Sequence, residues 1–378
     1  MNISIFSSKI NLNTGDALGG YGPGRFSVAA SNDLEVNGIS FTGADGHQYQ
    51  LCSIDTLYAG RLNAEFSNSD YISIFAASHT HYAPMLDDNK PHIGTFSQTG
   101  FDAYVHTLRK LKRIEASPTR CRLYQSSVDV PIYRRFDYPD RWWNRILTRY
   151  FGFYPNEEKK IDKNIYIFEF LDEKSAKFVI VYHACHPVSR GNTCELSSDY
   201  VGEVRDIVRK KFNVETVLFL QGCAGDVRPN LAHKRINFLP KFRLNWKFNY
   251  HPSAQETARV NESYRHAILA AMRCRDIALG EDKFNVFIQK KSLADGKEIN
   301  ITTIRLSNNI EFVFLPFEVS HLYHSVSFSS KKKLQLIVSC ANDTLGYLSH
   351  PVQHRAGGYE VYGSLNCMGL KEKIKIKE

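Results

Sequence analysis

The sequence predicts an α/β protein in which mixed β-sheets are flanked by helices. Two observations support this fold class: short apolar runs rich in β-branched and aromatic residues recur along the chain, and segments with helical periodicity alternate with them. A third observation is that internal repeats and Pro/Gly/Ser-rich linkers are missing, which favours a single domain over residues 1–378.

Each predicted strand is a short apolar run bounded by polar or turn-forming residues. Helical periodicity is clearest at residues 101–114, 199–212 and 253–278, and Asp199 is interpreted as the N-cap of the second helix. The predicted strands lie near residues 37–42, 49–55, 71–77, 120–128, 163–170, 177–183, 214–220, 285–292, 300–306, 310–316 and 334–340.

The composition is that of a folded protein and argues against several classes. No run approaches the ~18 consecutive apolar residues of a membrane-spanning helix. The first six residues lack the basic and long apolar regions of a signal peptide. Eight cysteines without framework spacing indicate reduced, mostly buried thiols. We therefore expect a cytoplasmic protein, with the inner face of the membrane as an alternative location.

The formal net charge of +9 is concentrated in a few segments. Residues 133–160 and 231–252 interleave basic and aromatic side chains and are long for connections, so we interpret them as insertions that form lids or binding loops. Such loops could bind a phosphorylated amphiphile or the periphery of a membrane, or they could be solvated loops whose rings pack on the domain. No nucleic-acid-binding motif is present, so the expected partner is an anionic small molecule.

Histidines follow two of the predicted strands. His79 and His81 come after residues 71–77, and strand alternation would place both on one face, where one could bind a metal and the other could face substrate. His186 is a better candidate ligand than His183, because Pro187 forces an extended turn that would direct the His186 side chain off the end of the strand. His183 is interpreted as a structural residue within its strand.

A carboxylate and two phenols follow the later strands. Glu318 would be costly to bury without a cation, which could be an arginine or a metal. Tyr347 and Tyr359 lie beside glycine-rich turns and could supply a phenolic ligand and an oxyanion donor. Backbone N–H groups at Gly222 and Gly225 could approach a ligand as well. Two histidines, a carboxylate and a phenol at strand ends would make a catalytic zinc site, which indicates a metal-dependent hydrolase.

Seven short segments occur in a fixed order along nearly the whole chain. None of them is specific alone, but their shared order and spacing are. The segments are Gly20-Tyr21-Gly22 with Arg25, Ser53-Ile54-Asp55-Thr56, Ser78-His79-Thr80-His81, His186-Pro187-Val188-Ser189, Gly225-Asp226-Val227-Arg228-Pro229-Asn230, Phe317-Glu318, and Asn342 to Tyr347.

In this order the segments resemble the neutral/alkaline ceramidase family, whose catalytic domain is a zinc-dependent amidase. The resemblance implies a ceramidase-like zinc hydrolase domain with Zn2+ held by His79, His186, Glu318 and Tyr347. It also implies that the scissile amide is faced by His81, Arg134 and Tyr359, and that the substrate is contacted by Gly22 and Asp226. Arg135 stays an alternative to Arg134, because Tyr133-Arg134-Arg135 replaces the family's Asn-Arg-Ser.

One departure from the family bears on the substrate. Arg228 stands where the family has a serine that contacts substrate, and a guanidinium suits a phosphate or carboxylate better than a neutral lipid headgroup. We therefore expect a zinc-dependent amidohydrolase, an N-deacylase or N-deacetylase, that cleaves a linear N-acyl amide of an anionic, phosphorylated sugar or lipid-linked substrate. The alternatives are a true ceramidase acting on N-acylsphingosine, and a non-catalytic basic protein that binds a membrane or nucleic acid. The oligomeric state stays open.

Overall fold

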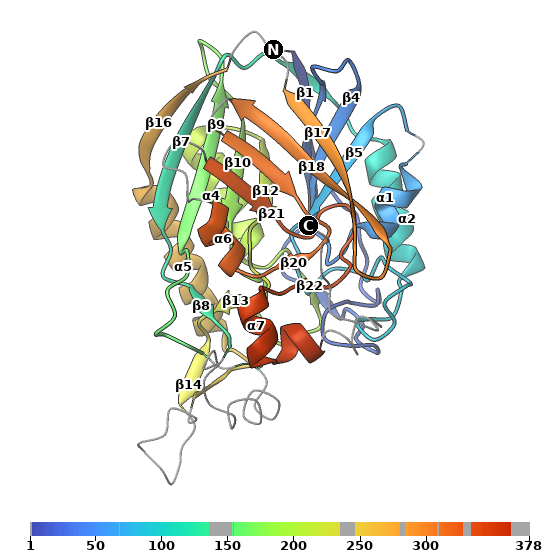
Figure 1. Cartoon of the computed structure of the whole chain (residues 1–378), viewed down its shortest axis with the longest axis vertical. Coiled ribbons are helices and arrows are strands. Elements are labelled where there is room, and N and C mark those ends of the chain that lie inside the picture. The colour runs from blue at the N-terminus through green and yellow to red at the C-terminus, as the bar shows by residue number, and fades with distance from the viewer. Residues whose placement is uncertain are drawn as a thin grey trace.

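The computed structural model confirms the predicted fold class: several mixed sheets are flanked by helices (Figure 1). Residues 136–152, 154 and 235–245 of the two basic and aromatic insertions lie outside the described part of the chain. The structure describes residues 2–67, 69–135, 153, 155–234, 246–279, 284–307, 310–327 and 334–363.

The first sheet has five strands in the order β5-β4-β3-β1-β6. Neighbouring strands are antiparallel except β4 and β5, which are parallel. Its strands are β1 (Ile3–Lys9), β3 (Glu35–Thr42), β4 (Gln48–Ile54), β5 (Ile72–Ala77) and β6 (Ile114–Ala116).

The second sheet also has five strands, in the order β12-β10-β9-β7-β16. Only β10 and β12 are parallel, so the carboxyl ends of these two strands meet at one edge of the sheet. Its strands are β7 (Arg120–Ser127), β9 (Asn164–Leu171), β10 (Ala176–His183), β12 (Thr216–Gln221) and β16 (Met272–Ala278).

The two sheets share a core and carry helices on their other faces. Alternate residues of one strand enter different clusters: Ile180 packs between the sheets, whereas Val179 and Val181 pack with α4 (Tyr200–Phe212) and α5 (Ala254–Ala270). In the first sheet, Phe75 likewise faces away from the shared core, in a cluster that includes α1 (Gly60–Glu65) and α2 (Gln98–Arg109). Figure 1 shows α1 and α2 on one side of the sheets and α5 on the other.

A third sheet, in the order β17-β18-β19-β21, adds Phe312, Phe314 and Leu336 to the shared core. Its last strands lead the chain into the short ladder of β20 (Glu318–Val319) and β22 (Tyr347–Leu348). The sheet consists of β17 (Asn285–Ser292), β18 (Glu298–Ser307), β19 (Ile310–Phe314) and β21 (Leu334–Val338).

The remaining elements are short. Within the described ranges, no helix is long and apolar enough to cross a membrane. The short elements are the strands β2 (Ala29–Ala30), β8 (Pro131–Tyr133), β11 (Glu195–Leu196), β13 (Val227–Pro229), β14 (Ala232–Lys234) and β15 (Trp246–Phe248), the helices α6 (Leu322–Ser327) and α7 (Pro351–Ala356), and the π-helix η2 (Tyr359–Gly363).

Two predicted helices are shorter than the sequence pattern suggests, and several strands were not predicted, among them β1, β6 and β16. The helix predicted at 253–278 ends at Ala270, because the following residues form β16 and pair with β7. The helix predicted at 101–114 spans Gln98–Arg109, and Ile114 begins β6. β1 was not predicted, although it lies between β3 and β6. In each case long-range strand pairing decided the structure.

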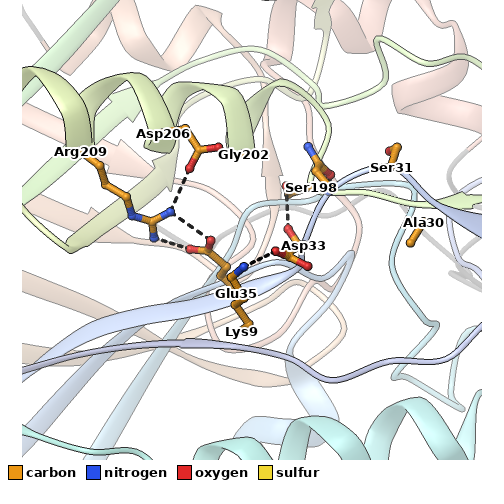
Figure 2. A pocket seen from close by; sticks show the side chains of 10 residues that line it. Lys9, Ala30, Ser31, Asp33, Glu35, Ser198, Gly202, Asp206 and Arg209 are labelled. Carbon is orange, nitrogen blue, oxygen red and sulfur yellow. Dashed lines mark hydrogen bonds and ion pairs between the residues drawn. The ribbon is translucent and has the colours of Figure 1, made fainter.

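A buried ion-pair network joins α4 to the first sheet. Arg205 is 1% exposed, and its guanidinium donates to Asp55 at the end of β4, while Arg209 donates to Glu35 at 3.0 Å. Figure 2 shows the adjoining pocket of about 380 Å³, where Lys9 also pairs with Asp33 at 2.6 Å. Because each charged side chain that lines this pocket has an opposite charge beside it, we interpret it as a structural joint.

Candidate metal centre

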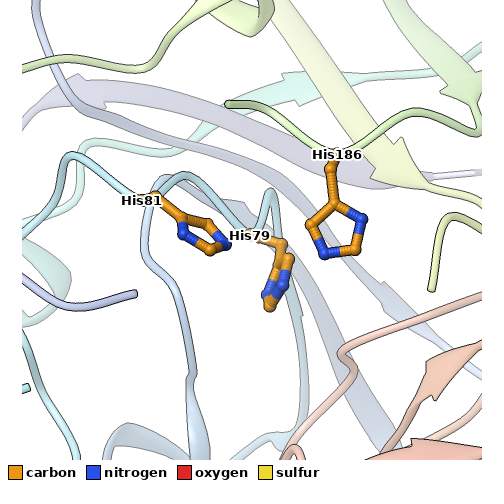
Figure 3. Close-up of side chains that lie close together, drawn as sticks. All are labelled: His79, His81 and His186. Carbon is orange, nitrogen blue, oxygen red and sulfur yellow. The ribbon is translucent and has the colours of Figure 1, made fainter. Parts of the chain in front are cut away.

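His79 and His81 lie in the loop after β5, and His79 has an unusual backbone conformation. Its φ is 68°, in the left-handed region that costs an L-residue about 1–2 kcal/mol. The hydrogen bond from His79 N to Thr56 O, 3.0 Å, helps to hold this turn. The strand alternation expected for the two histidines is therefore wrong, because β5 ends at Ala77. Their rings converge nonetheless, with centroids 5.3 Å apart (Figure 3).

His186 enters the same centre from the loop after β10. Its backbone N–H donates to Val227 O at 3.1 Å, which ties the loop to the turn after β12. Its ring centroid lies 4.9 Å from that of His79. His183 is the last residue of β10 and contacts Asn164 O and the Tyr264 hydroxyl, so it is structural, as the sequence predicts.

Backbone carbonyls orient the two imidazoles. His79 Nδ1 lies 3.1 Å from Leu57 O, and His186 Nδ1 lies 2.6 Å from Ala224 O. A carbonyl only accepts, so each Nδ1 carries a proton, and each Nε2 would present a lone pair to a metal when the ring is neutral. The two Nε2 atoms converge on one oxygen of Glu318, at 3.3 Å from His79 and 3.2 Å from His186.

Strand pairing places Glu318 beside Tyr347. The two residues are register partners in the parallel ladder of β20 and β22, and Glu318 N donates to Gly346 O at 2.9 Å. The other carboxylate oxygen of Glu318 accepts from the Tyr58 hydroxyl at 3.4 Å. Sequence reasoning missed Tyr58, although its place just after the end of β4 is the same signal that drew attention to the histidines.

The buried Glu318 carboxylate lacks a permanent cation. It is 3% exposed, and within the described ranges its ion pairs are with His79 and His186, not with an arginine or lysine. Burial opposes its charge, but these two imidazoles outweigh it and hold the pKa of Glu318 well below its usual range. For His79, burial is outweighed in turn by Cys340 and Glu318, which raise its pKa. A bound metal cation could supply the charge that Glu318 requires, so the donors fit a divalent metal.

His81 completes the cluster of imidazoles. The ligand nitrogens of His79, His81 and His186 all lie within 4.8 Å of one another, so the three residues could hold a metal. Both ring nitrogens of His81 are buried and have no hydrogen-bond partner among the described residues. Burial, together with His79 and His186, holds the pKa of His81 well below its usual range. A neutral, unpaired imidazole at this place could bind the metal or transfer a proton.

Arg134 and Arg135 point to different groups, although they are adjacent in sequence. Arg134 donates to the Tyr347 hydroxyl at 3.1 Å and to Gly225 O at 2.7 Å. Arg135 donates to Gly357 O and pairs with Glu360, which also pairs with Arg134. Arg134 therefore contacts Tyr347 of the candidate metal centre directly, whereas Arg135 holds the segment that follows α7. Sequence reasoning missed Glu360, which forms ion pairs with both guanidinium groups.

Tyr359 is the first residue of η2 and lies near Tyr347, with ring centroids 5.8 Å apart. Phe153, which belongs to the first insertion, packs edge-to-face on Tyr359, with ring centroids 4.9 Å apart. The Arg134 guanidinium carbon lies 4.3 Å from the Phe153 ring centroid. The predicted catalytic groups Arg134 and Tyr359 thus lie on the Tyr347 side of the centre, and His81 lies on the histidine side.

Asp226 is fully buried and its oxygens are occupied. They accept from the Ser320 hydroxyl and the Gln353 amide, both at 2.6 Å, and from His321 N at 2.8 Å. Its negative charge is favoured by these contacts and by the His321 ring, which hold its pKa well below the usual range despite burial. This carboxylate ties the turn after β12 to the segment after Glu318, so any effect on substrate is exerted through the backbone it holds.

The turn after β12 does not offer the free backbone donors that its glycines suggested. Gly222 N donates to His183 O and Gly225 N donates to Val319 O, both at 2.8 Å. The prediction of ligand-directed N–H groups here is wrong, because the strands compete for them. Gly225 is needed for a different reason: a Cβ at this position would lie 2.8 Å from Glu318 O.

The glycine-rich segment near the N-terminus packs against His81. A Cβ on Gly20 would lie 2.3 Å from His81 Nδ1, whereas Gly22, the predicted substrate contact, has open space around it. Arg25 donates to Gly19 O at 3.0 Å and to His81 O at 3.3 Å, which joins this segment to the histidine loop. Gly20 therefore determines how closely the segment can approach the imidazole.

We expect Gly20→Ala to lower the hydrolase activity that the sequence predicts by more than its effect on stability. Gly20 has a φ of 99° and Gly24 a φ of 80°, so alanine at either position should cost about 1–2 kcal/mol of stability. Only at Gly20 would the new methyl group displace His81, and misplacing a catalytic group by ~1 Å can cost ~100-fold in rate. Unfolding and steady-state kinetics of both variants check this. Equal activity losses in Gly20→Ala and Gly24→Ala would refute a specific role for the Gly20 contact.

Comparison with known proteins supports the fold of the chain that carries this centre. No protein-family model matches the chain, and no curated protein matches it in sequence. A neutral ceramidase from Pseudomonas aeruginosa superposes with a TM-score of 0.65 at 13% identity, covering 98% of this chain and 72% of that one. The chain has the neutral ceramidase fold. A ceramidase complexed with C2 gives a TM-score of 0.63 at 13% identity, covering 98% of this chain and 73% of the other.

Proposed function

We propose that this ceramidase-fold protein is a zinc-dependent amidohydrolase that cleaves an N-acyl amide. The observation that carries the proposal is the convergence of His79 Nε2 and His186 Nε2 on one oxygen of the buried Glu318 carboxylate. Two imidazoles and a carboxylate are the donor set of many catalytic zinc sites, and Tyr347 stands beside Glu318 as a fourth donor. The shared fold with a neutral ceramidase makes amide hydrolysis the first reaction to test.

Zinc at this position would polarise an amide carbonyl and lower the pKa of water. His81 is neutral and unpaired among the described residues. It can therefore accept a proton from water as the water attacks the carbonyl carbon, and return that proton to the leaving amine. Arg134 orients the Tyr347 hydroxyl through its 3.1 Å hydrogen bond. Tyr359, on the Tyr347 side, can donate its hydroxyl to the carbonyl oxygen as negative charge develops there.

The substrate we propose is a small N-acylated amine that carries an anionic group, such as an N-acetylated, phosphorylated sugar. The support for this substrate is Arg228, whose side chain is 3% exposed. Arg228 follows Val227, whose carbonyl accepts from the backbone N–H of His186. Ceramide is the alternative that the fold favours. Release of fatty acid from a long-chain ceramide in detergent would support that alternative, whereas release of acetate from anionic N-acetyl amines would support our proposal.

The test is metal analysis combined with an amide-hydrolysis panel. We expect about one zinc per chain in the purified protein, loss of hydrolysis on chelation, and recovery when zinc is restored. His79→Ala should lower the zinc content well below that of wild type, while the exposed-site variant His92→Ala should retain it. A folded wild type that binds no metal, or that hydrolyses amides equally well after complete chelation, would refute the proposal.

A further inference from the structure

We propose that Arg228 and Tyr21 form a binding subsite beside His81 for a carboxylate or phosphate group of the ligand. As a subsite for the reacting molecule the inference rests on the proposed amidase function, but anion binding itself can be tested without it. It would make Arg228 the residue that determines substrate specificity.

The first observation is that Arg228 is buried without an anion. It is 3% exposed. Among the described residues, its Nε has no hydrogen-bond partner and no carboxylate forms an ion pair with it. Burying an uncompensated charge is costly, so a protein that retains one gains something from it. The missing anion is most simply supplied by a ligand.

The other buried arginines in the described part of the chain show what compensation looks like. Arg134 and Arg135 share Glu360, Arg205 pairs with Asp55, and Arg25 donates to three backbone carbonyls. Arg228 has neither kind of partner. Its lack of compensation is therefore specific to this position and is not a general property of the fold.

The second observation is how the Arg228 guanidinium is packed. Its central carbon lies 4.4 Å from the ring centroid of Phe248, 5.3 Å from that of Tyr250 and 6.0 Å from that of Phe153. Aromatic faces stabilise the cation but accept few hydrogen bonds, so they leave the N–H groups at the guanidinium edge available. A planar fork held in this way suits bidentate binding of a carboxylate or phosphate. Tyr250 is 40% exposed, which places one wall of the subsite at the surface.

The third observation places the subsite next to the catalytic centre. Arg228 follows Val227, whose carbonyl accepts from both the backbone N–H and the Nδ1 of His186. On the other side, Tyr250, which packs on the Arg228 guanidinium, accepts from Asn192 N at 2.8 Å. The preceding residue, Gly191, accepts from the Tyr82 hydroxyl, and the Tyr82 ring lies 6.4 Å from that of Tyr21. Burial raises the pKa of Tyr21, and the positive charge of Arg228 opposes this rise. The Tyr21 ring packs edge-to-face on His81, with centroids 5.1 Å apart. Arg228, Tyr21 and His81 therefore border one region.

Tyr21 has a hydroxyl to offer a ligand. It is buried, and its interaction with the Tyr82 hydroxyl does not have the geometry of a hydrogen bond. The neighbouring Tyr82 hydroxyl is already used, since it donates to Gly191 O at 2.8 Å and accepts from Arg190 N at 3.2 Å. The negative charge of Asp199 adds to the effect of burial in raising the pKa of Tyr21. The Asp199 carboxylate already accepts hydrogen bonds from the backbone N–H and the hydroxyl of Ser189. An anion bound by Arg228 could accept from Tyr21 as well.

The direct test is binding of inorganic phosphate and of acetate to the purified protein by calorimetry at constant ionic strength. We expect Arg228→Gln to weaken phosphate binding at least ~10-fold, because a charge-assisted hydrogen bond is lost. Arg228→Lys should be intermediate, since lysine retains the charge but not the fork. The matched control is Arg190→Gln, because Arg190 lies near Tyr82 and is already paired with Glu195. Equal phosphate affinities in wild type and folded Arg228→Gln would overturn the inference.

A second measurement uses wild type alone, in case Arg228→Gln does not fold. The substrates are N-acetyl amines with one skeleton that carry a phosphate, a carboxylate or an uncharged hydroxyl group. We expect kcat/KM at least ~10-fold higher for an anionic member than for the uncharged one, and the ratio of the two anions identifies which group is preferred. Equal values across the series would overturn the inference. If no amide is cleaved, the proposed function fails, while phosphate binding still decides the inference.

Discussion

Replacing Glu318 by glutamine should remove both the metal and amide hydrolysis, whereas replacing His81 by glutamine should remove hydrolysis alone. The Glu318 carboxylate is the shared neighbour of His79 Nε2 and His186 Nε2, so its neutral amide would leave the cation site without its negative charge. We expect at least ~1000-fold loss of kcat/KM, because the centre would lack its metal. His81→Gln should cost ~100- to 10,000-fold, the usual contribution of a positioned acid–base group.

Metal content and kinetics of the two variants, measured on the same preparations, separate these roles. His92→Gln is the control, since His92 is exposed. Full metal content in Glu318→Gln would show that the metal centre is assigned wrongly. Loss of metal in His81→Gln would instead make His81 a ligand, which the proximity of the three imidazole groups permits.

Replacing Glu360 by glutamine should destabilise the fold by ~3–5 kcal/mol, because two buried guanidinium groups would lose their common counter-ion. Arg134 and Arg135 are 4% and 3% exposed, so water cannot replace the carboxylate. The same change should lower kcat, because Arg134 reaches the Tyr347 hydroxyl from this ion pair. Unlike Glu318→Gln, this variant should retain its metal wherever it is folded.

Urea-induced unfolding, followed by metal analysis of the folded fraction, checks this prediction. Glu195→Gln is the control: it removes a carboxylate from Arg190, but both side chains of that pair are partly exposed, at 23% and 33%. Exposed ion pairs contribute at most ~1 kcal/mol, so the control should unfold near the wild-type midpoint. A Glu360→Gln midpoint equal to that of the control would show that other groups neutralise the two arginines.

The sequence was sufficient for the elements whose signal is local. The strands around Ile180 and Phe75 follow from short apolar runs, and the start of α4 follows from Asp199, whose side chain accepts from Tyr200 N. The sequence was not sufficient where long-range pairing overrides local preference. Residues 272–278 continue a helical pattern, yet they form β16, because β7 offers unpaired backbone groups along that edge.

The candidate site divides in the same way. The order of the short motifs, through their resemblance to a known family, predicted which side chains come together: His79, His81, His186, Glu318 and Tyr347, each of which follows a strand. The tertiary structure decided how they face each other, through the left-handed turn at His79, the carbonyls that orient two imidazoles, and the ladder that pairs Glu318 with Tyr347.

The tertiary structure also placed Arg134 within hydrogen-bond distance of the Tyr347 hydroxyl, paired Arg135 with Glu360, and left Arg228 as the buried guanidinium without an anion among the described residues. The physical reason is that strand ends are encoded by local hydrophobic patterns, whereas the direction and charge balance of a side chain depend on groups distant in sequence. The amino-acid sequence alone therefore determined the fold class and the set of candidate ligands. Only the folded chain decided their geometry and left the buried Arg228 without an anion among the described residues.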